Sequence, residues 1–194
     1  FLPDLLSRQH VKEMVDRLAQ SAPKLVEDVV PKVLTLADIQ RVLRQLLRER
    51  VPVKDLATIL ESVADVAGQT KDTDVLVEAA RVGSGRAICR QYQNEKGELP
   101  AIALAPTLEE RLMQSLARTD QGLVLALDPK EAKSLASRIA SAIESAMAQP
   151  VLLCSAGLRP HLWRLFSRVL PHIGVMAHTE IPAHVKITPV AVLD

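Results

Sequence analysis

The chain has 194 residues, 48% of them apolar and 24% charged, which is a globular composition that excludes a disordered tail. Its 24 basic and 23 acidic residues give a net charge of +1, without the basic excess of a non-specific nucleic-acid binder. Two cysteines are too few for a disulfide framework, and no apolar run reaches the ~18–20 residues of a membrane-spanning helix. We therefore expect a reduced, cytosolic environment. Because the chain begins at Phe1 rather than at Met, we also expect a fragment of a longer protein.

The first half of the chain is predicted to be a small helical bundle. Ser7 can cap a helix whose apolar residues recur at helical spacing, and a short helical segment follows at Lys24–Val30. The Thr35–Asp38 capping box starts the helix with the strongest apolar face, formed by Ile39, Val42, Leu43, Leu46 and Leu47. A third helix buries Leu56, Ile59, Leu60 and Val63. A fourth runs from Asp72 to Arg90 and buries Val75, Leu76, Ala79 and Ile88.

The second half is predicted to be a small α/β domain with a mostly parallel sheet. Short apolar runs at Ala101–Ala105, Leu123–Leu127, Val151–Cys154 and Ile173–Ala177 alternate with helical stretches at Leu108–Arg118, Pro129–Met147 and Leu158–Val169. A last run, Val185–Val192, contains Pro189 and is expected to be an edge strand. The polar turn Gln93–Glu98 marks the predicted boundary. The fold class is thus mixed α and β, a helical bundle followed by an α/β domain.

One motif invites a catalytic interpretation. Cys154-Ser-Ala-Gly157-Leu-Arg159 follows an apolar strand and opens a helix, like the persulfide loop of rhodanese-type sulfurtransferases. Tyrosine phosphatases need one more residue between the Cys and the Arg and fit worse. Pro160 removes an amide donor that an anion cradle would use. A structural, buried Cys154 is the alternative that we favour, because free cysteines are among the most buried residues.

Two other features resemble a phosphate-binding loop and a metal site, but neither has the full pattern. Gly83-Ser84-Gly85-Arg86 lacks the Lys-Ser/Thr ending of a phosphate loop and interrupts a helical pattern, so close helix packing or a kink explains it better. His178 and His184 match no zinc-site spacing and have no cysteine pair beside them. We expect no cofactor, no metal and no catalytic constellation.

Basic residues line the polar face of the helix behind Thr35. Arg41, Arg44 and Arg48 lie at i, i+3 and i+7, and Arg50 and Lys54 continue this basic stripe. Acidic residues that follow in the sequence, Asp55 among them, could pair with it from another copy of the chain. The stripe is either a solvated face or one half of a subunit contact.

Several segments along the whole sequence resemble those of a known family. Pro23–Pro31, Leu46–Leu56 and Thr58–Glu61, and later Leu127–Pro129, Pro150–Ser155, Leu158–Pro160, Leu170-Pro171 and Glu180–Pro182, resemble the C-terminal cytoplasmic region of the FlhA family. These proteins are the large membrane subunits of flagellar type III export gates. The homologous subunit of virulence injectisomes shares most of these motifs, and the flagellar family is our preference. The resemblance covers essentially the whole chain in order. Departures fall near Ser84 and at Ala177–Glu180.

The resemblance implies a non-enzymatic docking scaffold on the cytoplasmic side of a bacterial inner membrane. It implies that residues 1–20 are the final helix of a preceding subdomain, 21–98 a ring-forming helical subdomain and 99–194 a C-terminal α/β subdomain. The implied partners are further copies in a ring, commonly of nine subunits, together with export chaperones carrying their substrates and components of the export ATPase complex. Because the resemblance implies a ring, it favours the interpretation of the basic stripe as one half of a subunit contact. The residues expected at subunit contacts are Arg41, Arg44, Arg48, Arg50, Asp55 and Arg81.

Overall fold

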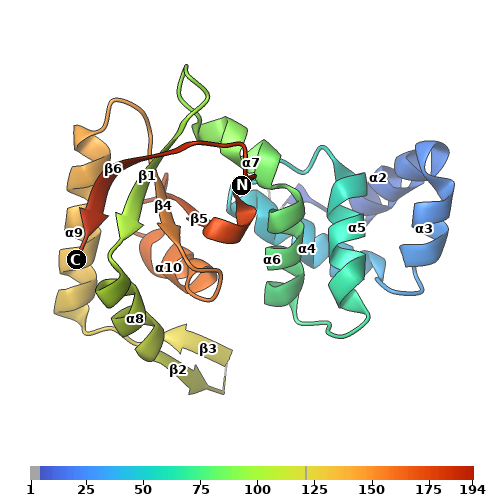
Figure 1. The fold of residues 1–194 in the computed structure, drawn as a ribbon. Helices are drawn as coiled ribbons and strands as arrows, with labels where there is room; N and C mark the ends of the chain where they lie inside the picture. Colours follow the sequence, from blue (N-terminus) through green and yellow to red (C-terminus); the bar gives the residue numbers. More distant parts are fainter. Residues whose placement is uncertain (1–4, 121) are drawn as a thin grey trace. The chain divides into compact units, whose positions relative to one another are not determined.

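The computed structural model describes residues 5–120 and 122–194 and divides into two compact units (Figure 1). We call the described residues up to Ile88 the helical unit, and Cys89–Asp194 the α/β unit. The three-part division at 1–20, 21–98 and 99–194 stays a prediction. No helix within the described ranges is both long enough and apolar enough to cross a membrane.

The helical unit is built from α2 (Arg8–Ser21), α3 (Pro23–Val29), α4 (Leu36–Arg48), α5 (Leu56–Ala67) and α6 (Thr73–Gly83). Its helix starts are those that the sequence predicts: Ser7 caps α2, and Thr35 and Asp38 form a complete capping box at α4. The predicted inward face of α4 is buried at four of its five positions, and Leu47 is partly exposed. All four predicted core residues of α5 are buried. Helical periodicity therefore placed most of this core correctly.

The predicted helix from Asp72 to Arg90 is wrong in one respect, because the chain breaks it at Ser84 into α6 and α7 (Gly85–Tyr92). A Cβ built on Gly83 would lie 2.0 Å from the Oγ of Ser62 on α5. Only glycine lets α6 approach α5 this closely, so close helix packing explains Gly83. Val75, predicted to be buried, is 43% exposed, whereas Leu76 and Ile88 are buried.

The main sheet of the α/β unit is fully parallel, in the order β5-β4-β1-β6. Its strands are β1 (Leu99–Leu104), β4 (Val151–Cys154), β5 (Gly174–Ala177) and β6 (Ile187–Leu193). Ala101 is in register with Val151 on one side, and Leu99 with Ile187 on the other. The mostly parallel sheet and the edge position of β6 are as predicted.

Three helices pack on the sheet of the α/β unit: α8 (Pro106–Gln114), α9 (Pro129–Ser145) and α10 (Arg159–Phe166). Alternate strand residues such as Ile102, Leu104 and Leu152 share one buried cluster with Leu112, Ile139 and Leu162 of these helices. Since side chains on a strand alternate between faces, α8, α9 and α10 cover the same face of the sheet. Asp128 caps α9 and Pro129 is its first residue, as predicted.

The segment between α8 and α9 differs from the prediction. The helix expected over Leu108–Arg118 ends at Gln114, and Leu116–Thr119 forms a strand, β2. The predicted strand at Leu123–Leu127 is β3 (Gly122–Leu125), which pairs antiparallel with β2 instead of joining the main sheet. So short a connection permits only antiparallel pairing, because a parallel neighbour needs a crossover of a dozen or more residues.

Candidate functional site

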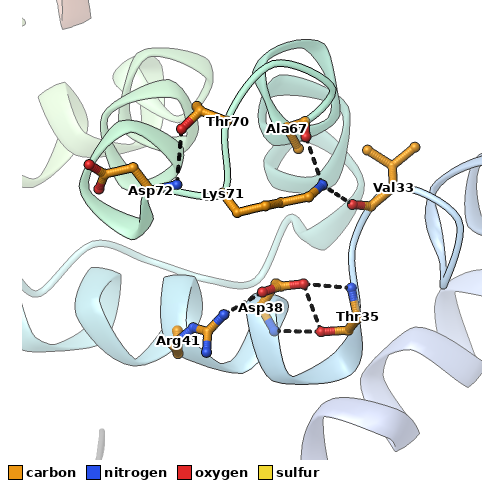
Figure 2. A network of polar contacts seen from close by, with 8 residues as sticks. All are labelled: Val33, Thr35, Asp38, Arg41, Ala67, Thr70, Lys71 and Asp72. Carbon is orange, nitrogen blue, oxygen red and sulfur yellow. Dashed lines mark hydrogen bonds and ion pairs between the residues drawn. The ribbon is translucent and has the colours of Figure 1, made fainter.

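The first turn of α4 holds the beginning of the basic stripe in a closed network of polar contacts (Figure 2). The Oδ2 atom of Asp38 accepts hydrogen bonds from the Thr35 amide at 2.9 Å and from its hydroxyl at 2.7 Å. These bonds, with the nearby Arg41 guanidinium, lower the pKa of Asp38 against the opposing effect of burial. Arg41 donates to the other carboxylate oxygen of Asp38. The charge of Arg41 is thus balanced on its own helix.

Lys71 continues the polar network of Figure 2 into the neighbouring elements. Its ammonium group donates to the Ala67 carbonyl in the last turn of α5, at 2.7 Å, and to the Val33 carbonyl in the loop that enters α4. A single cation therefore satisfies a free carbonyl at a helix end and ties that end to the start of α4. The N-terminal end of the basic stripe consequently sits on a fixed scaffold.

Arg44 binds the chain that leads into α2. Its Nε donates to the Leu6 carbonyl at 3.1 Å, and Gln40, one turn earlier on α4, donates to the same oxygen at 2.7 Å. A double hydrogen bond to one carbonyl fixes the position of that peptide against α4. Arg44 is half-buried as a result, so its guanidinium is only partly available to a neighbour.

The remaining stripe residues lie at the C-terminal end of α4 and beyond it. Arg48 is exposed in the last turn of the helix, where a cation interacts favourably with the helix dipole. Arg50 has a left-handed backbone conformation, with φ at 60°, and is exposed. Asp55 caps α5 by accepting bonds from the Thr58 amide and hydroxyl. Of the six predicted contact residues, Arg41, Arg48, Arg50 and Asp55 are exposed, Arg44 is half-buried and Arg81 is buried.

Arg81 lies inside the helical unit rather than on its surface. Its Nη1 is 2.9 Å from the Oε2 of Glu49, and the two side chains are only 3% and 2% exposed. Gln45 donates to the other oxygen of Glu49 at 2.8 Å. The pair joins the end of α4 to α6. Arg81 therefore holds the C-terminal end of α4, where Arg48 lies, in place against α6.

The Cys154 loop lacks the geometry of an anion cradle. Cys154 is fully buried, and its Sγ lies 3.7 Å from the Met176 carbonyl. The amide of Ser155 donates to a carboxylate oxygen of Glu109 at 2.5 Å. A carboxylate therefore already occupies one of the amides that would have to bind a persulfide or phosphate anion.

Arg159, the arginine that ends the Cys154–Arg159 motif, is also fully buried. Its Nε lies 3.7 Å from an oxygen of Glu180, and both side chains are 1% exposed. In the same unit, burial and the Glu180 charge raise the pKa of Cys89 to about 11, which keeps that thiol protonated at neutral pH. Cys89 is therefore not an activated nucleophile, Cys154 is shielded from solvent by its full burial, and the charges of Arg159 and Glu180 neutralise each other.

Sequence reasoning missed Glu49, Gln40 and Lys71, which hold the stripe in place. One signal was present for the first of them: Arg81 follows Val77 and Ala80 on the buried face of its helix, so a buried acid had to accompany it. Lys71 and Gln40 bind backbone carbonyls, which no charge pattern reveals.

Comparison with known proteins decides the family. Residues 1–186 match the model of the FHIPEP family. The chain belongs to the FHIPEP family. The flagellar biosynthesis protein FlhA of Bacillus subtilis is 32% identical over 98% of the chain, and that of Escherichia coli is 38% identical over 95%. The chain spans only 29% and 27% of these FHIPEP relatives, in the C-terminal part of each.

Solved structures share the fold across both units. The Chlamydia pneumoniae CdsV protein in complex with CdsO is 28% identical, with a TM-score of 0.84 over 99% of this chain and 57% of that one. The nonameric EPEC SctV-C has a TM-score of 0.88 over 99% of this chain and 58% of that one, and at 20% identity it shows the fold alone. FHIPEP proteins belong to flagellar and type III secretion export apparatus and are not enzymes. The sulfurtransferase interpretation of Cys154 is therefore wrong.

Proposed function

We propose that this chain is a cytoplasmic segment of a flagellar type III export gate in a bacterial inner membrane. In the intact protein it forms a homo-oligomeric ring, nonameric in number, that docks export chaperones with their substrates. The observation that carries the proposal is the family match over residues 1–186, joined to relatives of 32–38% identity that are named FlhA. That naming favours the flagellar gate over its injectisome homologue.

Two observations support ring formation: the similarity of the fold to a relative that forms rings, and the exposed charges of the helical unit. The EPEC relative assembles as a nonamer on the same fold. In the helical unit Arg48 offers an exposed charge at the end of α4, held there by the buried pair of Arg81 and Glu49. We infer that Arg48, together with the outer part of Arg44, meets acidic side chains of the adjacent copy. Each such pair is weak, about 0.2–1 kcal/mol, but a closed ring repeats it at every interface.

The test is the assembly state of the full cytoplasmic region by mass photometry at low salt. The double variant Arg44→Glu, Arg48→Glu should lose rings, and the loss should be larger at low salt than at high salt because exposed pairs are screened. The matched control, Lys96→Glu with Lys130→Glu, places the same charge change on exposed residues of the α/β unit and should assemble normally. Unaltered rings in the double variant would return the stripe to a solvated face.

A single variant should separate the proposed contact from effects on monomer stability. Arg44 holds the Leu6 carbonyl within the unit, so its reversal should also cost about 0.5–1.5 kcal/mol of monomer stability. Arg48→Glu alone should leave thermal unfolding nearly unchanged and still weaken the ring. A ring lost only together with monomer stability would contradict a direct contact.

The partners of this segment follow from the same proposal. The chaperone–substrate complexes and the export ATPase components are expected to bind the assembled ring. Support for a bound partner protein comes from the Chlamydia relative, which was solved in complex with CdsO. Co-purification of the full cytoplasmic region with a flagellar chaperone loaded with its substrate tests docking, and the ring-deficient double variant supplies the control.

A further inference from the structure

An open hollow of about 430 Å³ lies between α9 and α10 in the α/β unit. On the α9 side it is lined by Ala132, Ala136 and Ala140, which succeed one another at single-turn spacing. On the α10 side Leu165 lines it, and Val169 and Leu170 line it just beyond the helix end. The alanine side chains are too short to reach across, so the two walls stay apart and the hollow opens to solvent.

The lining of this groove is mostly apolar. Val169 is 63% exposed, and Leu165 and Leu170 are partly exposed, whereas Phe166 beneath them is fully buried in the core. Exposed apolar side chains that gather in a concave surface are typical of binding grooves, whereas scattered ones are ordinary. The floor is anchored in the core of the unit, so the groove is preformed.

The rim of the groove is cationic. Lys133 lines it directly, Lys130 precedes that residue on the same helix, and Arg168 adjoins Val169. Glu144 stands one turn beyond Ala140, and from there to Glu180 the sequence contains no acidic residue. The nearer acid of α9, Glu131, is already engaged by Arg111 of α8 at 3.1 Å. Lys133 therefore supplies a positive charge in the lining itself, and Lys130 and Arg168 are exposed basic residues close to lining residues in the sequence.

We propose that this groove binds an acidic amphipathic helix of a partner protein. The apolar side chains of such a helix, at i, i+3 or i+4, and i+7, occupy the hollow, and its flanking Asp and Glu side chains meet Lys133 and Arg168. A helix fits because the groove runs between two helices with apolar walls on both sides. An anionic membrane would require the apolar residues to project outward, but most of them line a concavity. The inference goes beyond the proposed function and does not depend on ring formation.

The test uses the whole chain and two fluorescent probe peptides of about 18 residues, long enough to populate a helix. Both carry Leu at i, i+3, i+4 and i+7, and they differ only in flanking Glu or flanking Lys residues. Fluorescence anisotropy should show saturable binding of the Glu peptide and at least tenfold weaker binding of the Lys peptide. Raising the salt concentration should narrow that difference.

Two variants locate the binding in the groove. Lys133→Glu with Arg168→Glu should weaken binding of the Glu peptide at least tenfold and reverse the preference between the peptides. Ala136→Trp fills the hollow and should abolish binding of both. Because the tryptophan could disturb packing, the thermal unfolding of Ala136→Trp is compared with that of the parent chain. If their unfolding temperatures differ, the charge variant alone tests the proposal. Lys54→Glu with Lys96→Glu is the matched control, since both residues lie outside the groove, and should bind normally.

Three results would overturn the proposal. The first is equal binding of the two peptides, or binding that both groove variants leave unchanged. The second is binding to phosphatidylglycerol vesicles, but not to the Glu peptide, that disappears in the charge variant, because the groove would then face a lipid surface. The third is self-association of the parent chain in sedimentation velocity that is lost in Ala136→Trp, because the occupant would then be a second copy.

Discussion

The buried ion pair between Arg81 and Glu49 should govern the stability of the helical unit. Replacing Arg81 by Met keeps most of the side-chain volume but removes the Nη1 contact from the Glu49 carboxylate, which is 2% exposed and also accepts a hydrogen bond from Gln45. Removing one partner of a buried pair typically costs about 3–5 kcal/mol, because the remaining charge loses an ion-pair partner in a poorly solvated site. We expect Arg81→Met to lower the free energy of unfolding by that amount.

A double-mutant cycle measured by urea denaturation, monitored by circular dichroism, tests this expectation. Arg81→Met with Glu49→Met removes both charges and should recover most of the loss, since an apolar pair of similar volume is often neutral or stabilising. Arg48→Met, an exposed arginine of the same stripe, is the matched control and should change stability by less than about 0.5 kcal/mol. A cost below about 1 kcal/mol for Arg81→Met, or no recovery in the double variant, would refute the reasoning.

Three further outcomes are expected. Gly83→Ala should destabilise the helical unit by about 1–3 kcal/mol in thermal unfolding because its Cβ would meet Ser62, whereas Gly68→Ala, with nothing within 4 Å of the added Cβ, should be neutral or stabilising. Asp38→Asn should lower the free energy of unfolding by about 1 kcal/mol at pH 7. Because the folded-state pKa of Asp38 is lowered from 3.8, the stability difference between the parent chain and the variant should vanish as the pH falls below 3.8. A difference that persists at low pH would show that the ionised carboxylate is not its source. Cys154→Ala should cost about 1–2 kcal/mol and leave export intact, so loss of export at normal protein level would contradict a structural thiol.

Local signals predicted those parts of the fold that depend on neighbouring residues. The capping box at Thr35 and Asp38, the inward face of α4 and the strand Val151–Cys154 all follow from spacing within a few residues. The glycines beside Ser84 indicate the place of the helix break, but not the helix that Gly83 approaches, because the contact with Ser62 brings together two helices. Propensity alone makes a glycine in a helix costly, and packing against Ser62 explains why Gly83 is there.

The basic stripe shows the corresponding limit for function. The charge pattern identifies Arg44 as part of the basic stripe, but its hydrogen-bond acceptor in the structure is the carbonyl of Leu6, 38 residues away. Arg81 is expected at a subunit contact from the sequence, but in the structure it lies on the buried face of α6 and pairs with Glu49. Charge patterns identify the basic residues, but the backbone acceptors and buried partners that decide their roles appear only in the folded chain.

The most direct measurement of the central claim is an in-frame deletion of the coding sequence of this chain in the bacterium that encodes it. The culture supernatant is then assayed for flagellar and for injectisome substrates, with a plasmid copy of the whole gene as the control. The account predicts that secretion of hook and filament subunits and motility are both lost and are restored by the plasmid. Normal flagellar secretion and motility in the deletion strain would contradict it, and so would a loss confined to injectisome substrates.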